Sequence, residues 1–271
     1  MSYLEALILG IIQGLTEFLP VSSSGHIELG KVMLDVKMKD PLLFSIVVHG
    51  ATALSTIVIF WKTIWSLLTD LFKFQWNEST QYAGKILVSM IPVGLVGVLY
   101  ESQIEALFDG EILLVGLMLL VTGALLFLTT RVKETTGEVT FPKAIIIGLA
   151  QAIAILPGIS RSGATISTAL LSGISRENSA HFSFLMVLPP IIGAMLLKVK
   201  KYSEVASSGV PATESIDSTV LIIGFVAAFL TGLLACTWMI QLVKKGKLTY
   251  FAIYCFVVGA IAIGYSLLVG V

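Results

Sequence analysis

The sequence predicts an all-α polytopic membrane protein, and three observations support that prediction. Hydrophobic residues make up 56% of the 271 residues and charged residues only 13%, whereas a soluble domain carries roughly 25% charged residues. The mean hydropathy is +0.95. Long apolar runs recur along the whole sequence, so we expect lipid to be the solvent. The formal net charge of zero argues against nucleic acid as a partner.

Six apolar stretches are long enough to be transmembrane helices, since a helix needs roughly 20 residues to cross the hydrocarbon core. They are Leu42–Trp61, Ala83–Tyr100, Glu111–Thr130, Ala180–Val199, Ser218–Val243 and Tyr250–Val269. The connection Lys62–Lys85 is rich in aromatic residues, and we expect a helix there that lies in the membrane interface.

Two further apolar segments are broken by proline. Tyr3–Leu19 runs into LPVSSSGH, and Lys143–Leu156 runs into LPGISRSGAT. Proline and glycine interrupt helices, and hydroxyl groups at membrane depth are tolerated only where they line a protein-walled or watery cavity. We therefore expect two re-entrant helix pairs, each entering and leaving the membrane on the same side.

The two broken segments resemble each other at one constant offset, about half the length of the chain. This repeat offset places Gly10 on Gly148, Gln13 on Gln151, Ser22 on Ser160, Ser24 on Ser162 and Gly25 on Gly163. Three predicted spans follow each segment, and because three is odd, the second copy enters from the opposite face. The sequence thus predicts one membrane domain made of two inverted repeats, about 1–135 and 136–271, with a site near the midplane at their interface.

The positive charges predict the orientation, because cytoplasmic loops carry an excess of Lys and Arg. On this topology six such residues share a side with both termini: Lys31, Lys37, Lys39, Lys198, Lys200 and Lys201. Ten lie on the other side: Lys62, Lys73, Lys85, Arg131, Lys133, Lys143, Arg176, Lys244, Lys245 and Lys247. The bias makes the second side cytoplasmic and both termini external.

Glu17 is the first candidate for chemistry. It lies within an apolar run one helical turn after Gln13, so both side chains share a helix face. A carboxylate in a membrane segment is costly and marks a functional site by default, although a Glu near a helix end can also reach water.

The SSSGH run supplies a second group of candidates. A helix that resumes here presents unpaired N–H groups and its positive dipole end near Ser22, Ser23, Ser24 and Gly25, which suits phosphate. His26 is a candidate nucleophile, general base or metal ligand. Serine also caps helices in the absence of any ligand.

The run around Arg161 is the third group. Ser160, Ser162, Gly163 and Thr165 surround this arginine, and no acidic residue lies nearby in sequence to neutralise it. The guanidinium group suits phosphate oxygens, although an interfacial arginine can also bind lipid headgroups. If the clusters meet, the residues have the inventory for phosphoryl transfer. His49 and His181 are expected to be packed or interfacial.

The motifs QGLTEFLPVSSSGH and PGISRSGAT resemble the two signature motifs of the undecaprenyl-diphosphate phosphatase, or bacitracin-resistance, family. The resemblance extends over essentially the whole chain, including FSFLMVLPP after the second motif. It implies six spans with two re-entrant pairs in the bacterial cytoplasmic membrane. It also implies hydrolysis of undecaprenyl diphosphate on the external side, which recycles the cell-wall lipid carrier, and dependence on a divalent metal such as Mg or Ca.

By that resemblance, the catalytic residues are Glu17, Ser23, His26 and Arg161, with the metal at Glu17. We expect the substrate phosphates to be bound by Gln13, Ser22, Ser24, Gly25, Ser160, Ser162, Gly163 and Thr165, of which Ser22, Ser24, Gly25 and Gly163 follow from the motifs themselves and not from the resemblance. Many members have Glu where this chain has Gln13; glutamine cannot act as a base, so any metal or proton role rests on Glu17. Whether Ser23 or His26 attacks phosphorus stays open. The expected partners are the lipid substrate and membrane lipids, and a homodimer stays open.

Two other classes of protein compete with this interpretation. Inverted repeats with broken helices are typical of transporters, so a lipid-carrier flippase or anion transporter is one alternative. The second is the other lipid-phosphatase superfamily, which also uses SGH and SR elements. That superfamily needs a Lys-x6-Arg-Pro element and a His about six residues after its arginine, and this sequence has Ser167, Thr168 and Ala169 in that region.

Overall fold

A computed structural model of the chain describes residues 1–34, 36, 41–107, 111–207 and 217–269. Within these ranges the regular elements are helices, with one isolated β-bridge between Gly137 and Ile174. The helices are α1 (Tyr3–Phe18), α2 (Ser23–Met33), α3 (Pro41–Ile59), α4 (Trp61–Leu71), α5 (Glu78–Leu99), α6 (Glu101–Ala106), α7 (Ile112–Thr129), α8 (Phe141–Ile153), α9 (Arg161–Leu171), α10 (Arg176–Met186), α11 (Leu188–Ser207), α12 (Ser218–Lys244) and α13 (Thr249–Val269).

The prediction of an all-α polytopic membrane protein is confirmed. Five helices in the described ranges are long and apolar enough to cross a membrane: α5, α7, α12, α13 and the joined pair α10–α11 over Arg176–Lys200. A sixth span is reached if α3 is counted together with α4, from which it is bent by 79°. The predicted span Ala180–Val199 is thus divided into two helices next to Pro189 and Pro190, which lack the N–H group that a continuous helix needs.

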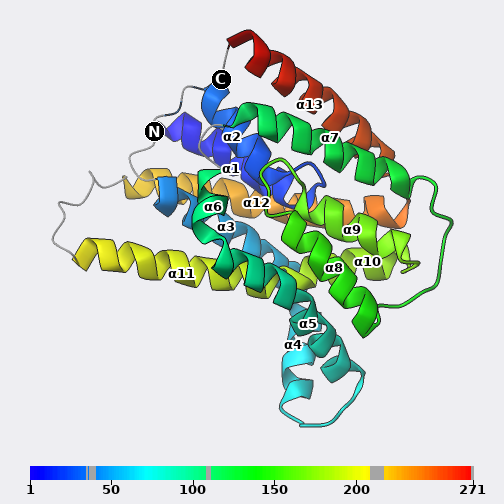
Figure 1. Cartoon of the computed structure of the whole chain (residues 1–271). Helices are drawn as coiled ribbons and strands as arrows, with labels where there is room; N and C mark the ends of the chain where they lie inside the picture. The colour runs from blue at the N-terminus through cyan, green and yellow to red at the C-terminus, as the bar shows by residue number, and fades with distance from the viewer. Residues whose placement is uncertain (35, 37–40, 108–110, 208–216, 270–271) are drawn as a thin grey trace.

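Helix α4 projects from the rest of the molecule (Figure 1). Trp61, Trp65, Phe72, Phe74 and Trp76, on the helix and just beyond it, are all exposed. Exposed Trp and Phe side chains beside a sharp bend are typical of a helix that lies at the headgroup level of a bilayer. A helix thus lies where the sequence predicts one near the start of the Lys62–Lys85 connection, and its place in the membrane interface stays a prediction.

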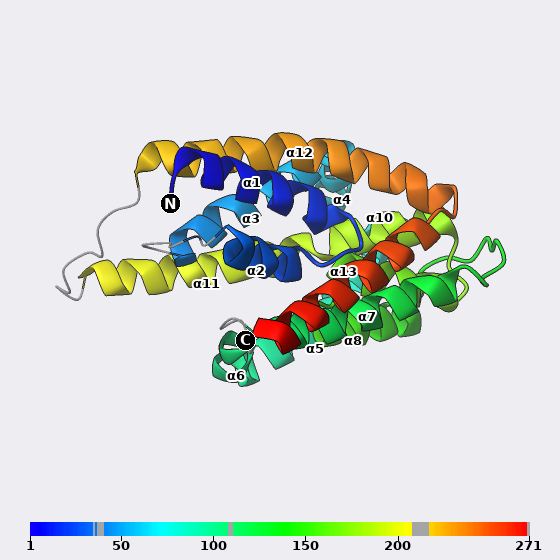
Figure 2. The same cartoon turned by 90° about the horizontal axis from the view of Figure 1, so that it is seen from above.

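The two proline-broken segments form two helix pairs, α1 with α2 and α8 with α9. Helix α1 has 16 residues and is about 24 Å long, too short to cross the hydrocarbon core and its interfaces. Each pair turns near its proline, and each turn contains one residue with positive φ: Ser22 at 70° and Gly158 at 94°. Helices α1 and α2 lie side by side, α1 along α12 and α2 beside α7 (Figures 1 and 2).

The helix bounds follow the repeat offset seen in the sequence. Helix α9 begins and ends at the counterparts of the residues that begin and end α2. Gly10 of α1 crosses α12 so closely that a Cβ would collide with Gly224 and Ala227, and Gly148 of α8 crosses α5 at Ser89 in the same way. Ser89 and Ala227 are themselves counterparts at this offset. Equivalent crossings are what an internal repeat predicts, and the division of the chain into two inverted repeats stays a prediction.

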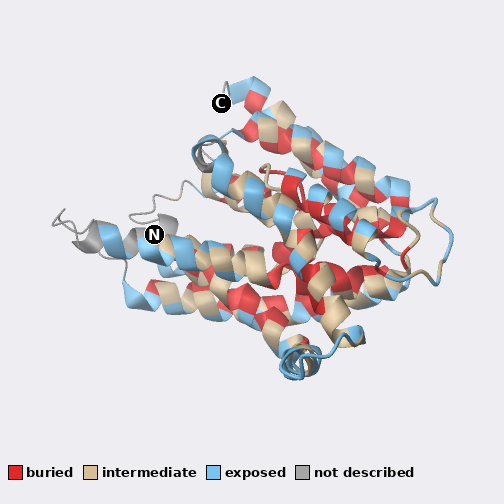
Figure 3. Ribbon diagram, turned by 60° about the horizontal axis from the view of Figure 1, so that its bottom comes forward, coloured by how far each residue is buried: buried red, intermediate tan, exposed pale blue. Residues whose placement is uncertain are grey.

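The buried residues gather in the middle of the molecule, and exposed residues are concentrated on the outer helices (Figure 3). Large exposed apolar side chains such as Leu4, Leu234 and Ile261 cover the outside, as expected where lipid is the solvent. Helices α9 and α10 are the most enclosed, since most of their residues are buried. The polar tips of the two helix pairs are therefore surrounded by protein.

Candidate active site

Each motif begins a helix with a serine N-cap. The Ser22 hydroxyl accepts a hydrogen bond from the Gly25 N–H at 3.3 Å, and the Ser160 hydroxyl accepts one from the Gly163 N–H at 3.0 Å. This capping satisfies one of the N–H groups that a helix start leaves unpaired. The remaining N–H groups and the positive ends of both helix dipoles stay available for an anion.

The two helix starts pack against each other's turns. A Cβ on Gly25 would lie 3.2 Å from the Gly158 Cα, and a Cβ on Gly163 would lie 3.3 Å from the Pro20 Cβ. Larger side chains at these two glycines would force the pairs apart. The glycines of the two motifs thus allow the tips of the two helix pairs to meet.

Glu17 joins the two motifs. Its Oε2 accepts hydrogen bonds from the Ser23 hydroxyl at 2.7 Å and from Gln13 Nε2 at 3.0 Å, while its Oε1 forms an ion pair with Arg161 Nη2. The Glu17 side chain is 5% exposed and that of Arg161 is 24% exposed. The arginine that lacks an acidic neighbour in sequence is therefore neutralised by a carboxylate 144 residues away.

The hydroxyls of the second motif mostly bond to protein. Ser162 donates to the Leu19 carbonyl at 3.3 Å and lies 3.2 Å from the Ser160 hydroxyl. The Thr165 hydroxyl lies 2.6 Å from that of Ser183 on α10 and donates to the Arg161 carbonyl at 2.9 Å. These contacts hold α9 against α10 and against the first helix pair. The Thr165 hydroxyl thereby bonds to the backbone of Arg161 and links it to α10.

His26 is directed away from Glu17 and Arg161. Its Nδ1 lies 2.9 Å from the Ser22 carbonyl oxygen, which can only accept, so Nδ1 donates. Its Nε2 then accepts from the Tyr254 hydroxyl at 2.8 Å, and the two rings are stacked. His26 and Tyr254 line a separate, mostly apolar cavity of about 470 Å³ between α1, α2, α7 and α13.

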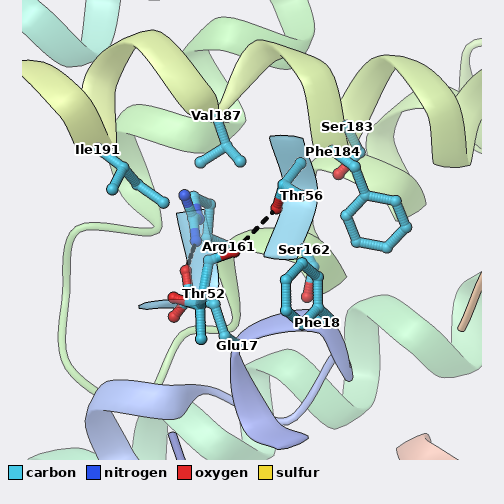
Figure 4. A pocket seen from close by; sticks show the side chains of 10 residues that line it. All are labelled: Glu17, Phe18, Thr52, Thr56, Arg161, Ser162, Ser183, Phe184, Val187 and Ile191. Carbon is cyan, nitrogen blue, oxygen red and sulfur yellow. Dashed lines mark hydrogen bonds and ion pairs between the residues drawn. The ribbon is translucent and has the colours of Figure 1, made fainter. Parts of the chain in front are cut away.

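A cavity of about 240 Å³ opens beside the Glu17–Arg161 pair. It has a polar end and an apolar wall, and its lining residues are Thr16, Glu17, Ser23, Ser24, His49, Val93, Gln151, Ala154, Ile155, Ile159, Ser160, Arg161, Val187, Pro190 and Ile191. A smaller pocket adjoins it, in which Glu17 and Arg161 face Thr52 and Thr56 of α3 (Figure 4). A polar end that continues into an apolar wall suits an amphipathic molecule with an anionic head.

The residues that line this cavity include His49 and Gln151, which are absent from the site that the sequence predicts. The sequence suggests a packed or interfacial role for His49, but this histidine lines the cavity, with Nδ1 donating to the Ser45 carbonyl at 2.9 Å. Gln151 lines it too, from α8. The only sequence signal for Gln151 is that it is the counterpart of Gln13 at the repeat offset.

The residues present fit a hard divalent cation that is held mainly by a ligand's own oxygens. Among the residues that the structure describes, no group of three or more His, Cys, Asp or Glu side chains could hold a metal alone. Glu17 supplies a carboxylate, and the buried Gln13 Oε1 has no hydrogen-bond donor within the described ranges. Mg²⁺ is commonly bound through one or two carboxylates together with substrate phosphates.

Comparison with known proteins identifies the family. The bacitracin resistance protein BacA family matches residues 6–261. A protein from Christiangramia forsetii, named undecaprenyl-diphosphatase, is 56% identical over 268 residues, which cover 98% of this chain and 99% of that protein. Proteins of the same name from Bacteroides fragilis and Halothermothrix orenii are 51% and 39% identical, with 98% and 97% of this chain and 99% and 98% of those proteins covered. With its two capped motifs meeting at Glu17 and Arg161, the chain belongs to the bacitracin resistance protein BacA family.

Proposed function

We propose that this protein is a multi-pass phosphatase of the bacterial cytoplasmic membrane that hydrolyses undecaprenyl diphosphate to undecaprenyl phosphate and phosphate. This reaction recycles the lipid carrier for cell-wall precursors and contributes to resistance to bacitracin. The observation that supports it best is the contact of both motifs at one carboxylate: Ser23 and Arg161 both bond to Glu17, beside a cavity with a polar end and an apolar wall. The relatives named undecaprenyl-diphosphatase agree with it.

Ser23 is the better candidate for the nucleophile. Its hydroxyl already donates to Glu17 at 2.7 Å, which is the contact between nucleophile and base that activation requires. In the proposed step the Ser23 Oγ bonds to the terminal phosphorus and its proton passes to Glu17. The bond from phosphorus to the bridging oxygen breaks, and prenyl phosphate leaves. Glu17 passes that proton to the departing prenyl phosphate, then takes a proton from the water that attacks the phosphoserine, and returns it to Ser23 Oγ as phosphate is released.

Arg161 and the two helix starts bind the negative charge. The guanidinium group can hold two phosphate oxygens at once, and the starts of α2 and α9, where the helix dipoles are positive, each pack against the turn of the other helix pair. When the diphosphate enters, its oxygens compete with Glu17 for Arg161, which leaves the carboxylate free to accept a proton. Held by Glu17 together with the diphosphate, a divalent metal such as Mg or Ca would neutralise part of the phosphate charge.

Phosphate release from the purified protein tests this function directly. In detergent no vectorial transport is possible, so a flippase or anion transporter would release no phosphate from a long-chain prenyl diphosphate. We expect steady release, and we expect a chelator to suppress it and added Mg²⁺ or Ca²⁺ to restore it. If no phosphate is released under any metal condition, the phosphatase activity is ruled out. If the release is insensitive to chelator, the requirement for a metal is ruled out.

Trapping the enzyme with a substrate labelled on its terminal phosphate distinguishes Ser23 from His26. We expect an acid-stable phosphoserine, because His26 bonds to Tyr254 and Ser22 instead of facing the cavity. Ser23→Ala should lose the label and at least roughly a thousand-fold in turnover. His26→Asn should keep the label at reduced turnover, because His26 holds the Ser22 carbonyl in the strained turn. An acid-labile label that disappears in His26→Asn would reverse the assignment.

Arg161→Lys tests whether Arg161 stabilises the transition state. An ammonium offers one point charge where the guanidinium offers a planar pair of donors, so we expect turnover to fall about 100- to 1,000-fold. Arg131→Lys is the matched control, since Arg131 is an exposed arginine at the end of α7. If the turnover of Arg161→Lys stays within a few-fold of the parent, Arg161 does not stabilise the transition state and only binds headgroups.

We infer that the site faces the external side, since the first helix pair shares that side with the N-terminus in the topology that the positive charges favour. Cysteines at the two ends of α7 test this orientation: Glu111→Cys and Lys133→Cys both replace exposed residues. Both native cysteines are buried, so their background reaction is low. An impermeant thiol reagent should label Glu111→Cys in intact cells and Lys133→Cys only after permeabilisation. The opposite labelling pattern would show that the protein has the reverse orientation in the membrane.

A further inference from the structure

We infer that Gln151 is a substrate-binding residue whose side-chain amide donates to the phosphate oxygens of the diphosphate headgroup. Within the described ranges, neither its Nε2 nor its Oε1 has a hydrogen-bond partner, although the residue is only 2% exposed. Buried amides are almost always paired, because an unpaired one forfeits the hydrogen bonds that water would make. Gln151 lines the same cavity as Ser23 and Arg161, so its missing partner can come from a molecule bound there.

The repeat explains why this amide is unpaired. Gln13, its equivalent in the first half, donates to Glu17 four residues later at 3.0 Å. The residue four positions after Gln151 is Ile155, which lines the cavity but cannot accept a hydrogen bond. The same helix position thus presents an amide in both halves, and only the first half supplies a carboxylate for it.

An anionic oxygen is the acceptor that fits best. Arg161 and Ser160 line the cavity with Gln151, and Ser160 caps the start of α9. The proposed phosphatase reaction, on which this assignment rests, brings the nonbridging oxygens of a diphosphate to this point. The amide nitrogen donates to one of them, and Oε1 remains to accept from water or from a protonated phosphate oxygen.

Gln151→Leu tests the assignment, because leucine is similar in size and has no polar atoms. The probe is inorganic pyrophosphate, measured by its effect on the thermal unfolding midpoint of the full-length protein in detergent. We expect the half-saturating concentration to rise about 10- to 100-fold, the loss typical of a hydrogen bond to a charged group. The KM for prenyl diphosphate should rise similarly, with kcat within a few-fold of the parent.

A structural role would give a different result in the same experiment. If Gln151 is a ligand-binding amide, Gln151→Leu without pyrophosphate should unfold at or above the parental midpoint, because no hydrogen bond within the protein is lost. Gln241→Leu makes the same change at an exposed position of α12. It should leave both the unfolding midpoint and the half-saturating pyrophosphate concentration unchanged. A lower midpoint in Gln151→Leu with parental half-saturation would assign the amide to the fold and overturn the inference.

Gln151→Glu keeps the shape of the side chain and adds a negative charge. We expect it to bind pyrophosphate more weakly than Gln151→Leu does; parental binding would overturn the inference even if the leucine variant fails to fold.

The proposed function can fail separately. If the parent binds pyrophosphate through Gln151 but releases no phosphate from prenyl diphosphate, the phosphatase assignment fails and the binding site stands. If the parent is active and both variants match it in binding and KM, only the Gln151 assignment fails.

Discussion

The ion pair between Glu17 and Arg161 is the interaction on which the arrangement of the molecule depends. Either charge alone at membrane depth would be costly, and together the two groups neutralise each other. Because they belong to different helix pairs, they can meet only if the tips of both pairs reach the same point inside the protein. The short helices, the glycines at the tips and the surrounding spans together allow the two tips to come into contact.

The helix starts and the close crossings follow from the same requirement. A turn with hydroxyls and unpaired N–H groups cannot face lipid, so protein must enclose it. The spans α7 and α12 and the helices α9 and α10 provide that enclosure, and Thr122 of α7 bonds directly to the turn at Gly158 and Ser160. The result is a small polar centre inside an apolar shell.

The two halves use equivalent positions for different chemistry. At the repeat offset Ser23 corresponds to Arg161, Glu17 to Ile155 and His26 to Ala164. The first half thus contributes the carboxylate and the hydroxyl, and the second contributes the positive charge and the unpaired Gln151 amide. In the proposed mechanism the first half would supply the nucleophile and its base, and the second half would stabilise the charge of the transferred phosphoryl group.

The sequence by itself determined the fold class, the spans and the two broken segments, because hydropathy and helix breaking by proline and glycine are local properties. It also pointed to Glu17, Ser23 and Arg161, since polar residues stand out in apolar surroundings. Only the tertiary structure decided which side chains meet. It paired Arg161 with Glu17, turned His26 toward Tyr254, and brought His49 and Gln151 to the cavity wall. The physical reason is that a side chain's direction depends on how its helix is rotated and packed against distant segments, which no local pattern encodes.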